Sequence, residues 1–164
     1  MAERAATNPI KSYSMQYDSM EPTITANLDV LGDRSHYTKH RPKRWDVIVF
    51  TLPSEVSERG PQAGQYLKRI VGLPGETIHF TRDELIINGA KVSIPARLAD
   101  RFSSFKQFPD YKFGNETYRI PDDSVFVIGD NPRIYVVDSR VFGAIPIRNI
   151  ESRVVASVRA DPIT

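Results

Sequence analysis

Two side chains in this sequence, Ser19 and Lys68, are of the types that acyl transfer needs. Ser19 lies in the bend Asp18-Ser19-Met20-Glu21-Pro22-Thr23, whose proline has a fixed φ and pushes the residue before it toward extended geometry. A serine hydroxyl is a poor nucleophile until a base takes its proton. Lysine can be that base only when it is neutral, so its pKa must fall from ~10.4 by about two to three units.

Lys68 stands where such a fall in pKa is expected. It lies within Tyr66-Leu67-Lys68-Arg69-Ile70-Val71, a segment with the composition of a buried strand. Burial among apolar neighbours disfavours the charged ammonium. Ser-Lys pairs are a known variant of the acyl-transfer template. On spacing alone the pair is weak evidence, because a turn serine and a solvated lysine would look the same.

Other chemistries fit the sequence less well. There is no cysteine, which excludes disulfides, thiolate nucleophiles and zinc–thiolate sites. The histidines are His36, His40 and His79, and none lies in a recognisable nucleophile setting. His36 and His40 have helical spacing, but Arg41-Pro42 and the dense positive charge disfavour both a helix and a bound cation. We therefore expect neither a metal site nor a cofactor.

The composition is that of one globular domain. The 164 residues are 40% apolar and 26% charged, enough to bury a core. The net charge of +2 gives no basic stripe for nucleic acid, and residues 36–44 are interpreted as a solvated basic loop. No run approaches the ~18 apolar residues of a membrane span. Residues 1–10 lack the apolar core of a signal peptide, so the chain as given is expected to be soluble.

Short strands and frequent turns predict an all-β fold. Residues 1–11 are expected to be a flexible leader, and residues 12–164 a single domain. Residues 96–114 are the least regular, and their regularly spaced aromatic residues indicate either a helical turn packed on the core or an exposed apolar flap. Asn88-Gly89 is a strong hairpin signal, and 53–64 reads as a surface loop. Strands are expected at 12–17, 24–31, 45–50, 66–71, 77–80, 84–87, 91–94, 124–128 and 150–158.

Several ordered segments resemble the sequence boxes of type I signal peptidases. They are Ser19-Met20-Glu21-Pro22-Thr23, Arg44 to Phe50, Lys68 to Glu76, and Gly129-Asp130-Asn131 followed by Asp138-Ser139-Arg140 and Phe142-Gly143. The intervening segments 85–89 and 118–130 also fit, so the resemblance covers residues 12–158. It implies a signal-peptidase-like folded sheet or partial barrel of many short antiparallel strands. It also implies a membrane-anchored serine endopeptidase that removes signal peptides from exported preproteins and prefers small residues before the cut.

The resemblance assigns roles to individual residues. Ser19 would be the nucleophile and Lys68 the general base, with the Ser19 backbone N–H as one oxyanion donor. Arg69 with Asp130 and Arg140 with Asp138 would be ion pairs that hold the active-site loops. Gly129 would leave room beside Lys68. An extended substrate would add as a strand between two segments: Met15, Gln16 and Tyr17 on one side, and Gln65, Tyr66 and Leu67 on the other.

The same resemblance sets the surroundings expected for the protein. Its partners would be preprotein signal peptides and the membrane surface, and it would not bind nucleic acid. It would act at the extracytoplasmic face of a membrane. The amino-terminal anchor of the family does not precede Ser19 in this sequence, either because it was removed or because it never existed.

At three positions the sequence departs from the family. Tyr17 stands where a small Ser or Gly is common, and Val136 is nearest the place of a serine that orients the lysine, leaving Tyr135 as the only hydroxyl between Asn131 and Asp138. Trp45 stands where glycine is usual. An alternative function is therefore a catalytically impaired signal-peptidase-like protein that binds peptides or has a structural role. A self-cleaving relative of the repressor-type Ser-Lys peptidases is less well supported, because no DNA-binding segment precedes Ser19.

Overall fold

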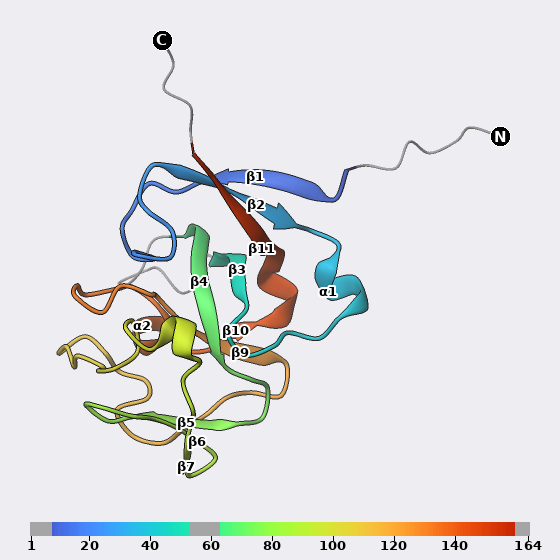
Figure 1. Ribbon diagram of the computed structural model, residues 1–164. Helices are drawn as coiled ribbons and strands as arrows, with labels where there is room; N and C mark the ends of the chain where they lie inside the picture. The colour runs from blue at the N-terminus through green and yellow to red at the C-terminus, as the bar shows by residue number, and fades with distance from the viewer. Residues whose placement is uncertain (1–7, 53–62, 160–164) are drawn as a thin grey trace.

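The chain folds into two antiparallel sheets joined by short connections (Figure 1). The computed structural model describes residues 8–52 and 63–159. The larger sheet has seven strands, in the spatial order β1 (Ile10–Ser14), β2 (Leu28–Asp33), β11 (Ile150–Arg159), β3 (Val47–Leu52), β4 (Gly64–Gly72), β9 (Ser124–Ile128) and β10 (Ile145–Pro146). The smaller sheet has four, in the order β7 (Ala90–Lys91), β6 (Leu85–Ile87), β5 (Thr77–Phe80) and β8 (Tyr118–Arg119). Short helical turns are α1 (His36–Lys39), η2 (Ala96–Leu98), α2 (Ser139–Phe142) and η3 (Ile147–Asn149).

Strands dominate the described chain, which confirms the predicted all-β class. All the strand pairings are antiparallel, and the larger sheet is open, with β1 and β10 at its edges. It is therefore a folded sheet and not a closed barrel.

The strand that carries Lys68 lies inside the larger sheet. β4 pairs with β3 on one side and β9 on the other, and Lys68 stands opposite Ile48. The first residues of β4 are exposed, whereas Leu67–Gly72 are buried. The apolar sequence that surrounds Lys68 thus becomes an enclosed strand, as its composition predicted.

The bend that carries Ser19 is fixed to the core by its own apolar residues. Met20 is fully buried and Ile24 is 3% exposed. Both belong to a core cluster with Val49 and Leu67 of the neighbouring strands β3 and β4. Ser19 itself stays half-buried at the surface of this cluster.

Several expectations about local structure were wrong in detail. The strands expected at 24–31 and 91–94 are instead β2 at Leu28–Asp33 and the short β7 at Ala90–Lys91. β1 begins at Ile10, inside the predicted leader, and ends at Ser14, so residues 15–17 are not a strand. The basic segment, interpreted as a loop, forms the single turn α1. Asp33 starts this turn by accepting hydrogen bonds from the backbone N–H and hydroxyl of Ser35. The predicted loop at 53–64 lies almost wholly outside the described residues.

Residues 96–114 are neither a helix nor an exposed flap. Only the 3-10 turn η2 is helical, yet Phe102, Phe105 and Tyr111 are all less than 5% exposed. Phe102 and Phe105 belong to the same core cluster as Phe80 of β5 and Phe126 of β9. The aromatic residues therefore pack on the core, as one interpretation required, but from an irregular backbone.

Candidate active site

The structure brings Ser19 and Lys68 together. Lys68 Nζ lies 3.0 Å from Ser19 Oγ and 3.0 Å from the carbonyl oxygen of Leu67. Lys68 is only 4% exposed. Burial lowers the pKa of Lys68 to about 8; the carboxylates of Asp138 and Asp130 oppose this shift and Arg140 adds to it. A lysine with such a pKa is partly neutral near physiological pH, as a general base must be.

The backbone of the Ser19 bend is held from two directions. Within the bend, Glu21 N–H donates to Asp18 O at 3.0 Å and Ile24 N–H donates to Met20 O at 2.9 Å. From outside, Asn131 donates its backbone N–H to Ser19 O at 3.1 Å and its side-chain amide to Asp18 O at 3.0 Å. None of the described residues accepts from the Ser19 backbone N–H, which leaves this donor available to an oxyanion.

A buried ion pair fixes the loop that carries Asn131. Arg69 donates from Nε to Asp130 Oδ1 at 2.8 Å and from a terminal nitrogen to Oδ2 at 2.6 Å. Asp130 is 0% exposed and also accepts from the hydroxyl of Thr23. Arg69 further donates to Trp45 O at 2.7 Å. The predicted Arg69–Asp130 pair is thus present, and it ties β4 to both active-site loops.

The second predicted pair, Arg140 with Asp138, is also present. Arg140 donates from Nε and from a terminal nitrogen to Asp138 at 3.0 and 2.6 Å. Asp138 caps α2 by accepting from Arg140 N–H, and it accepts from Gly129 N–H at 3.0 Å. The guanidinium of Arg140 lies 4.2 Å from the centre of the Tyr111 ring. Asp138 therefore joins α2 to Gly129, the first residue after β9.

Gly129 leaves room in a different place from the one predicted. A Cβ added there would lie 2.6 Å from Ser19 O and 2.7 Å from a methyl carbon of Val136. The closest neighbours are thus the carbonyl oxygen of Ser19 and a side chain of the loop after β9, and not Lys68. Glycine is required here because this loop and the Ser19 bend approach each other so closely.

An open groove of about 780 Å³ runs past Ser19 and Lys68. One wall comes from the segment before Ser19, the other from β4, and residues 134–137 complete the lining. Such an open groove along the start of β4 suits an extended peptide. The six residues predicted to contact substrate all line it: Met15, Gln16, Tyr17, Gln65, Tyr66 and Leu67.

The departures from the family pattern have distinct structural settings. Tyr17 lines the groove and is 74% exposed. Val136 is buried, and the Leu67 carbonyl provides the second hydrogen-bond partner of Lys68. Trp45 has a φ of +77°, a region that glycine enters most easily, which accounts for the glycine usual at this position.

Sequence reasoning missed several residues that shape the site. Thr23 bonds to Asp130, and Asn131 holds the Ser19 bend. Tyr111 accepts from the backbone N–H of Val136 at 3.1 Å. Thr23 and Asn131 lie inside the recognised boxes and could have been found there, whereas no local pattern marks Tyr111.

Within 8–52 and 63–159, no group of three or more His, Cys, Asp or Glu side chains is arranged to hold a metal ion. None of the helices in these two ranges has the length and apolar character needed to span a bilayer.

A serine hydroxyl beside a buried lysine, both in the lining of an open groove, defines a candidate Ser-Lys hydrolase site.

The chain belongs to the signal peptidase family, peptidase S26, whose model matches residues 4–159. It is 34% identical over 139 residues to signal peptidase I of Leptolyngbya laminosa, an alignment that covers 84% of this chain and 63% of that protein. It is 32% identical to signal peptidase I V of Bacillus subtilis (strain 168), covering 84% of this chain and 79% of that one.

A solved structure supports the same family. The crystal structure of a signal peptidase I from Enterococcus faecalis V583 matches with a TM-score of 0.50 and 28% identity. The match covers 71% of this chain and 98% of the other. The fold and family are thus those that the sequence boxes predicted.

Proposed function

We propose that the protein is a serine endopeptidase of the signal peptidase I type, which cleaves signal peptides from exported preproteins. The observation that carries this proposal is the 3.0 Å contact between Ser19 Oγ and the buried Nζ of Lys68, in a groove able to hold an extended chain. Membership of the signal peptidase family supports the substrate class.

The reaction would proceed in two acyl-transfer steps. Ser19 Oγ attacks the scissile carbonyl carbon while neutral Lys68 takes the hydroxyl proton. The Ser19 backbone N–H stabilises the resulting oxyanion. The intermediate collapses as Lys68 returns the proton to the leaving amine, and an ester to Ser19 remains. Water then attacks this ester, again with Lys68 as base, which releases the signal peptide and restores both side chains.

Substrate binding would use the two groove walls. The wall from β4 is a strand with which an extended peptide could pair. The opposite wall at residues 15–17 is not a strand, and the Met15 backbone already bonds to Leu28 and Asn27, so this wall would contact the peptide mainly through its side chains. Lys68 and Ser19 lie at the end of these walls, so the bond presented there is the one that is cut.

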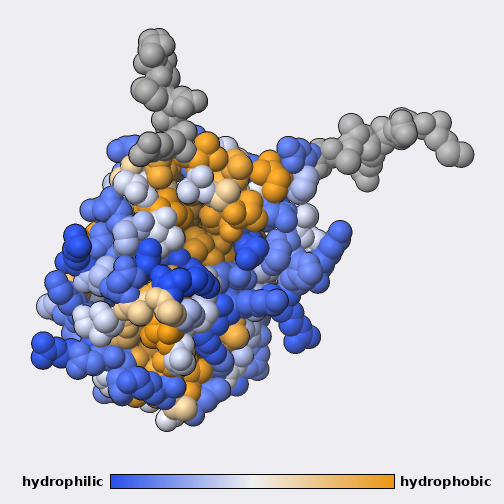
Figure 2. Space-filling model, viewed as in Figure 1, coloured by the Kyte–Doolittle hydropathy of each residue, from blue (hydrophilic) through white to orange (hydrophobic). Residues whose placement is uncertain are grey.

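We further propose that the groove works close to a membrane surface, at its extracytoplasmic face. Figure 2 shows apolar side chains gathered on the face where β1, β2 and β11 lie. Exposed apolar residues on these strands include Ile10, Val155 and Val158. A face of this kind suits contact with lipid next to a membrane-inserted signal peptide.

A cleavage assay tests the function. The substrate is a preprotein-derived peptide with alanine at the first and third positions before the cut, and mass spectrometry identifies the bond broken. The wild type should cleave directly after the alanine at the first position before the cut. The Ser19→Ala and Lys68→Ala variants should not cleave the peptide. Exposed residues offer matched controls, Ser12→Ala and Lys39→Ala, which should cleave normally.

Tyr17 and Val136 stand where serines of the family can donate to the oxyanion and orient the lysine. This difference favours a second candidate, a protein that binds such peptides without cutting them. Peptide binding by the wild type with no cleavage would support this second function. Equal cleavage by wild type and both active-site variants would contradict the Ser-Lys dyad.

A further inference from the structure

Arg101 links the irregular segment 96–114 to the Ser19 bend. Its Nε donates to Thr23 Oγ1 at 2.8 Å. A terminal nitrogen donates to Arg97 O at 2.9 Å and to Asp100 Oδ1 at 2.6 Å. The side chain is 17% exposed, compared with 67% for Asp100. Of these bonds, the one to Thr23 is the one that reaches the active site.

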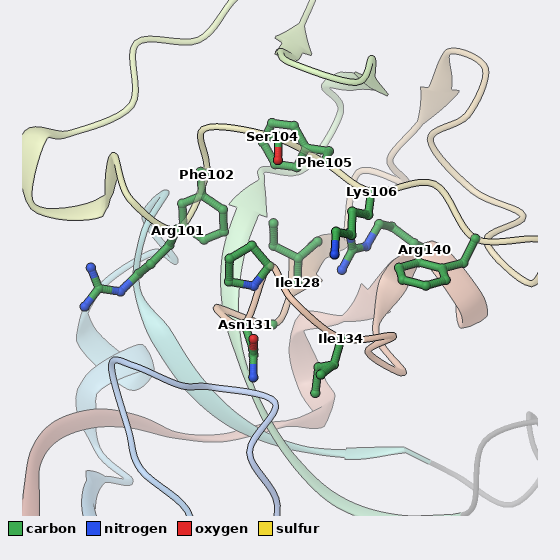
Figure 3. A pocket seen from close by; sticks show the side chains of 12 residues that line it. Arg101, Phe102, Ser104, Phe105, Lys106, Ile128, Asn131, Ile134 and Arg140 are labelled. Atoms are coloured by element: carbon green, nitrogen blue, oxygen red, sulfur yellow. The ribbon is translucent and has the colours of Figure 1, made fainter.

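The backbone around Arg101 is well anchored. Phe102 follows it directly, is 4% exposed, and lies with its ring 5.9 Å from that of Trp45 and 6.2 Å from that of Phe105. Figure 3 shows Phe102 and Phe105 above a small pocket, Asn131 on the opposite side, and the Arg101 guanidinium pointing away from it. An anchored backbone lets Arg101 act as a fixed donor.

The hydrogen bond from Arg101 determines where the Thr23 proton points. A threonine hydroxyl has one proton to donate. Because Arg101 donates to the Thr23 oxygen, the Thr23 proton is free to go to its other partner, Asp130 Oδ2. Asp130 is at the same time bound by Arg69. Arg101, Thr23, Asp130 and Arg69 thus form one continuous chain of hydrogen bonds, in which each bond polarises the next.

This chain ends at the groups that hold the nucleophile. Asn131, next to Asp130, bonds to the carbonyl oxygens of Ser19 and Asp18. Thr23 lies four residues after Ser19 in the same bend. The bend is therefore fixed near Ser19 by Asn131 and at Thr23 by Arg101 and Asp130. Small displacements of a nucleophile have large effects on rate.

We propose that Arg101 is a positioning residue for Ser19, which acts through Thr23 and Asp130 to keep the hydroxyl in line with Lys68. This role rests on the proposed peptidase function. It also gives residues 96–114, which lie outside the matched sequence boxes, a part in the reaction.

Arg101→Gln, Thr23→Val and the double variant test the proposal in the peptide cleavage assay. Each single variant should lower kcat by about tenfold or more and leave KM nearly unchanged. The double variant should be no slower than the worse single variant, because both remove the same chain. The apparent pKa of the rate should stay that of the wild type, since Lys68 keeps its surroundings.

Two controls separate positioning from general destabilisation. Asp100→Ala removes the exposed partner of Arg101 and should leave kcat unchanged. Thr23→Ser keeps the hydroxyl and should restore most of the activity lost in Thr23→Val. If Arg101→Gln fails to fold, the comparison of Val with Ser at position 23 still decides the result. Wild-type kcat in Arg101→Gln, or losses in kcat that multiply in the double variant, would overturn the proposal.

Hydrogen exchange gives a readout that does not depend on cleavage. In Arg101→Gln the amides of Glu21 and Ile24, which donate hydrogen bonds within the bend, should exchange about tenfold faster, while those of β6 should not change. Unchanged exchange at Glu21 and Ile24 would reject the positioning role even if no peptide were cleaved. Absence of cleavage by the wild type would reject the proposed function alone.

Discussion

The Nζ of Lys68 lies 3.0 Å from the carbonyl oxygen of the residue before it, Leu67. A neutral lysine has two N–H donors and one lone pair. The Leu67 carbonyl can take one N–H, which helps to turn the lone pair toward Ser19 Oγ, also at 3.0 Å. A backbone carbonyl thus stands in for the orienting hydroxyl expected near Val136. This contact favours an active enzyme over a peptide-binding relative.

The rate should depend on pH through Lys68. Burial lowers the pKa of Lys68 to about 8, and only the neutral amine can accept the Ser19 proton. We expect kcat/KM to rise about tenfold per pH unit below pH 8 and to level off above it. Initial rates of peptide cleavage between pH 6 and pH 10 would measure this. A rate that is flat or falls between pH 7 and pH 9 would exclude Lys68 as the base.

Lys68 should also make stability depend on pH. Its pKa is lower in the folded than in the unfolded state, so between about pH 8 and pH 10.5 the unfolded chain binds more protons. Stability from this group therefore rises with pH across that window. Lys68→Met removes the effect and should stabilise the protein by about 3 kcal/mol more at pH 7 than above pH 10.5. Urea unfolding of both proteins at about pH 7, 9 and 11 measures the difference, and parallel pH curves would contradict it.

Tyr17→Ser should raise the rate. The serine would place a hydroxyl where the family often has an oxyanion donor, and one such donor is commonly worth about 10²–10³ in kcat. Because Tyr17 is 74% exposed, stability should change by less than about 0.5 kcal/mol. Tyr17→Ala is the matched control, since it removes the ring without adding a hydroxyl. A rate for the serine variant no higher than for the alanine variant would mean that the hydroxyl does not reach the oxyanion.

Trp45 should carry a backbone cost that glycine relieves. Its φ is +77°, a region unfavourable for residues with a Cβ. Both Trp45→Gly and Trp45→Ala lose the contact with Phe102, so both should be less stable than the wild type. Between them, the glycine variant should be more stable by about 1 kcal/mol despite its greater unfolded-state entropy. Thermal unfolding of the two variants would decide, and greater stability of the alanine variant would show that the backbone is unstrained.

The sequence predicted the all-β class and the two ion pairs better than it predicted the supports of Ser19. Burial of Lys68 could be expected from the apolar character of Leu67 and Ile70 on a strand, whereas its pairing with Ser19 was predicted from the resemblance to the signal peptidase boxes. The bond from Arg101 to Thr23 depends on a tertiary approach of segments 78 residues apart, which no local pattern encodes. The Leu67 carbonyl is a backbone group, present at every position, so no residue type reveals its role. The α1 turn was missed because the basic residues after His36 were expected to repel one another and keep the segment open. The hydrogen bonds from Ser35 to Asp33 start the turn despite this repulsion.

The most direct test of the Ser19–Lys68 pair is covalent trapping with an acylating peptide inhibitor at pH 8. Intact-mass spectrometry should show one acyl group on the wild type, and peptide mapping should place it on Ser19. Ser19→Ala should gain no mass, and Lys68→Met should react far more slowly because its serine has no base. A wild type that stays unmodified, or a Ser19→Ala variant acylated as fast as the wild type, would contradict the assignment.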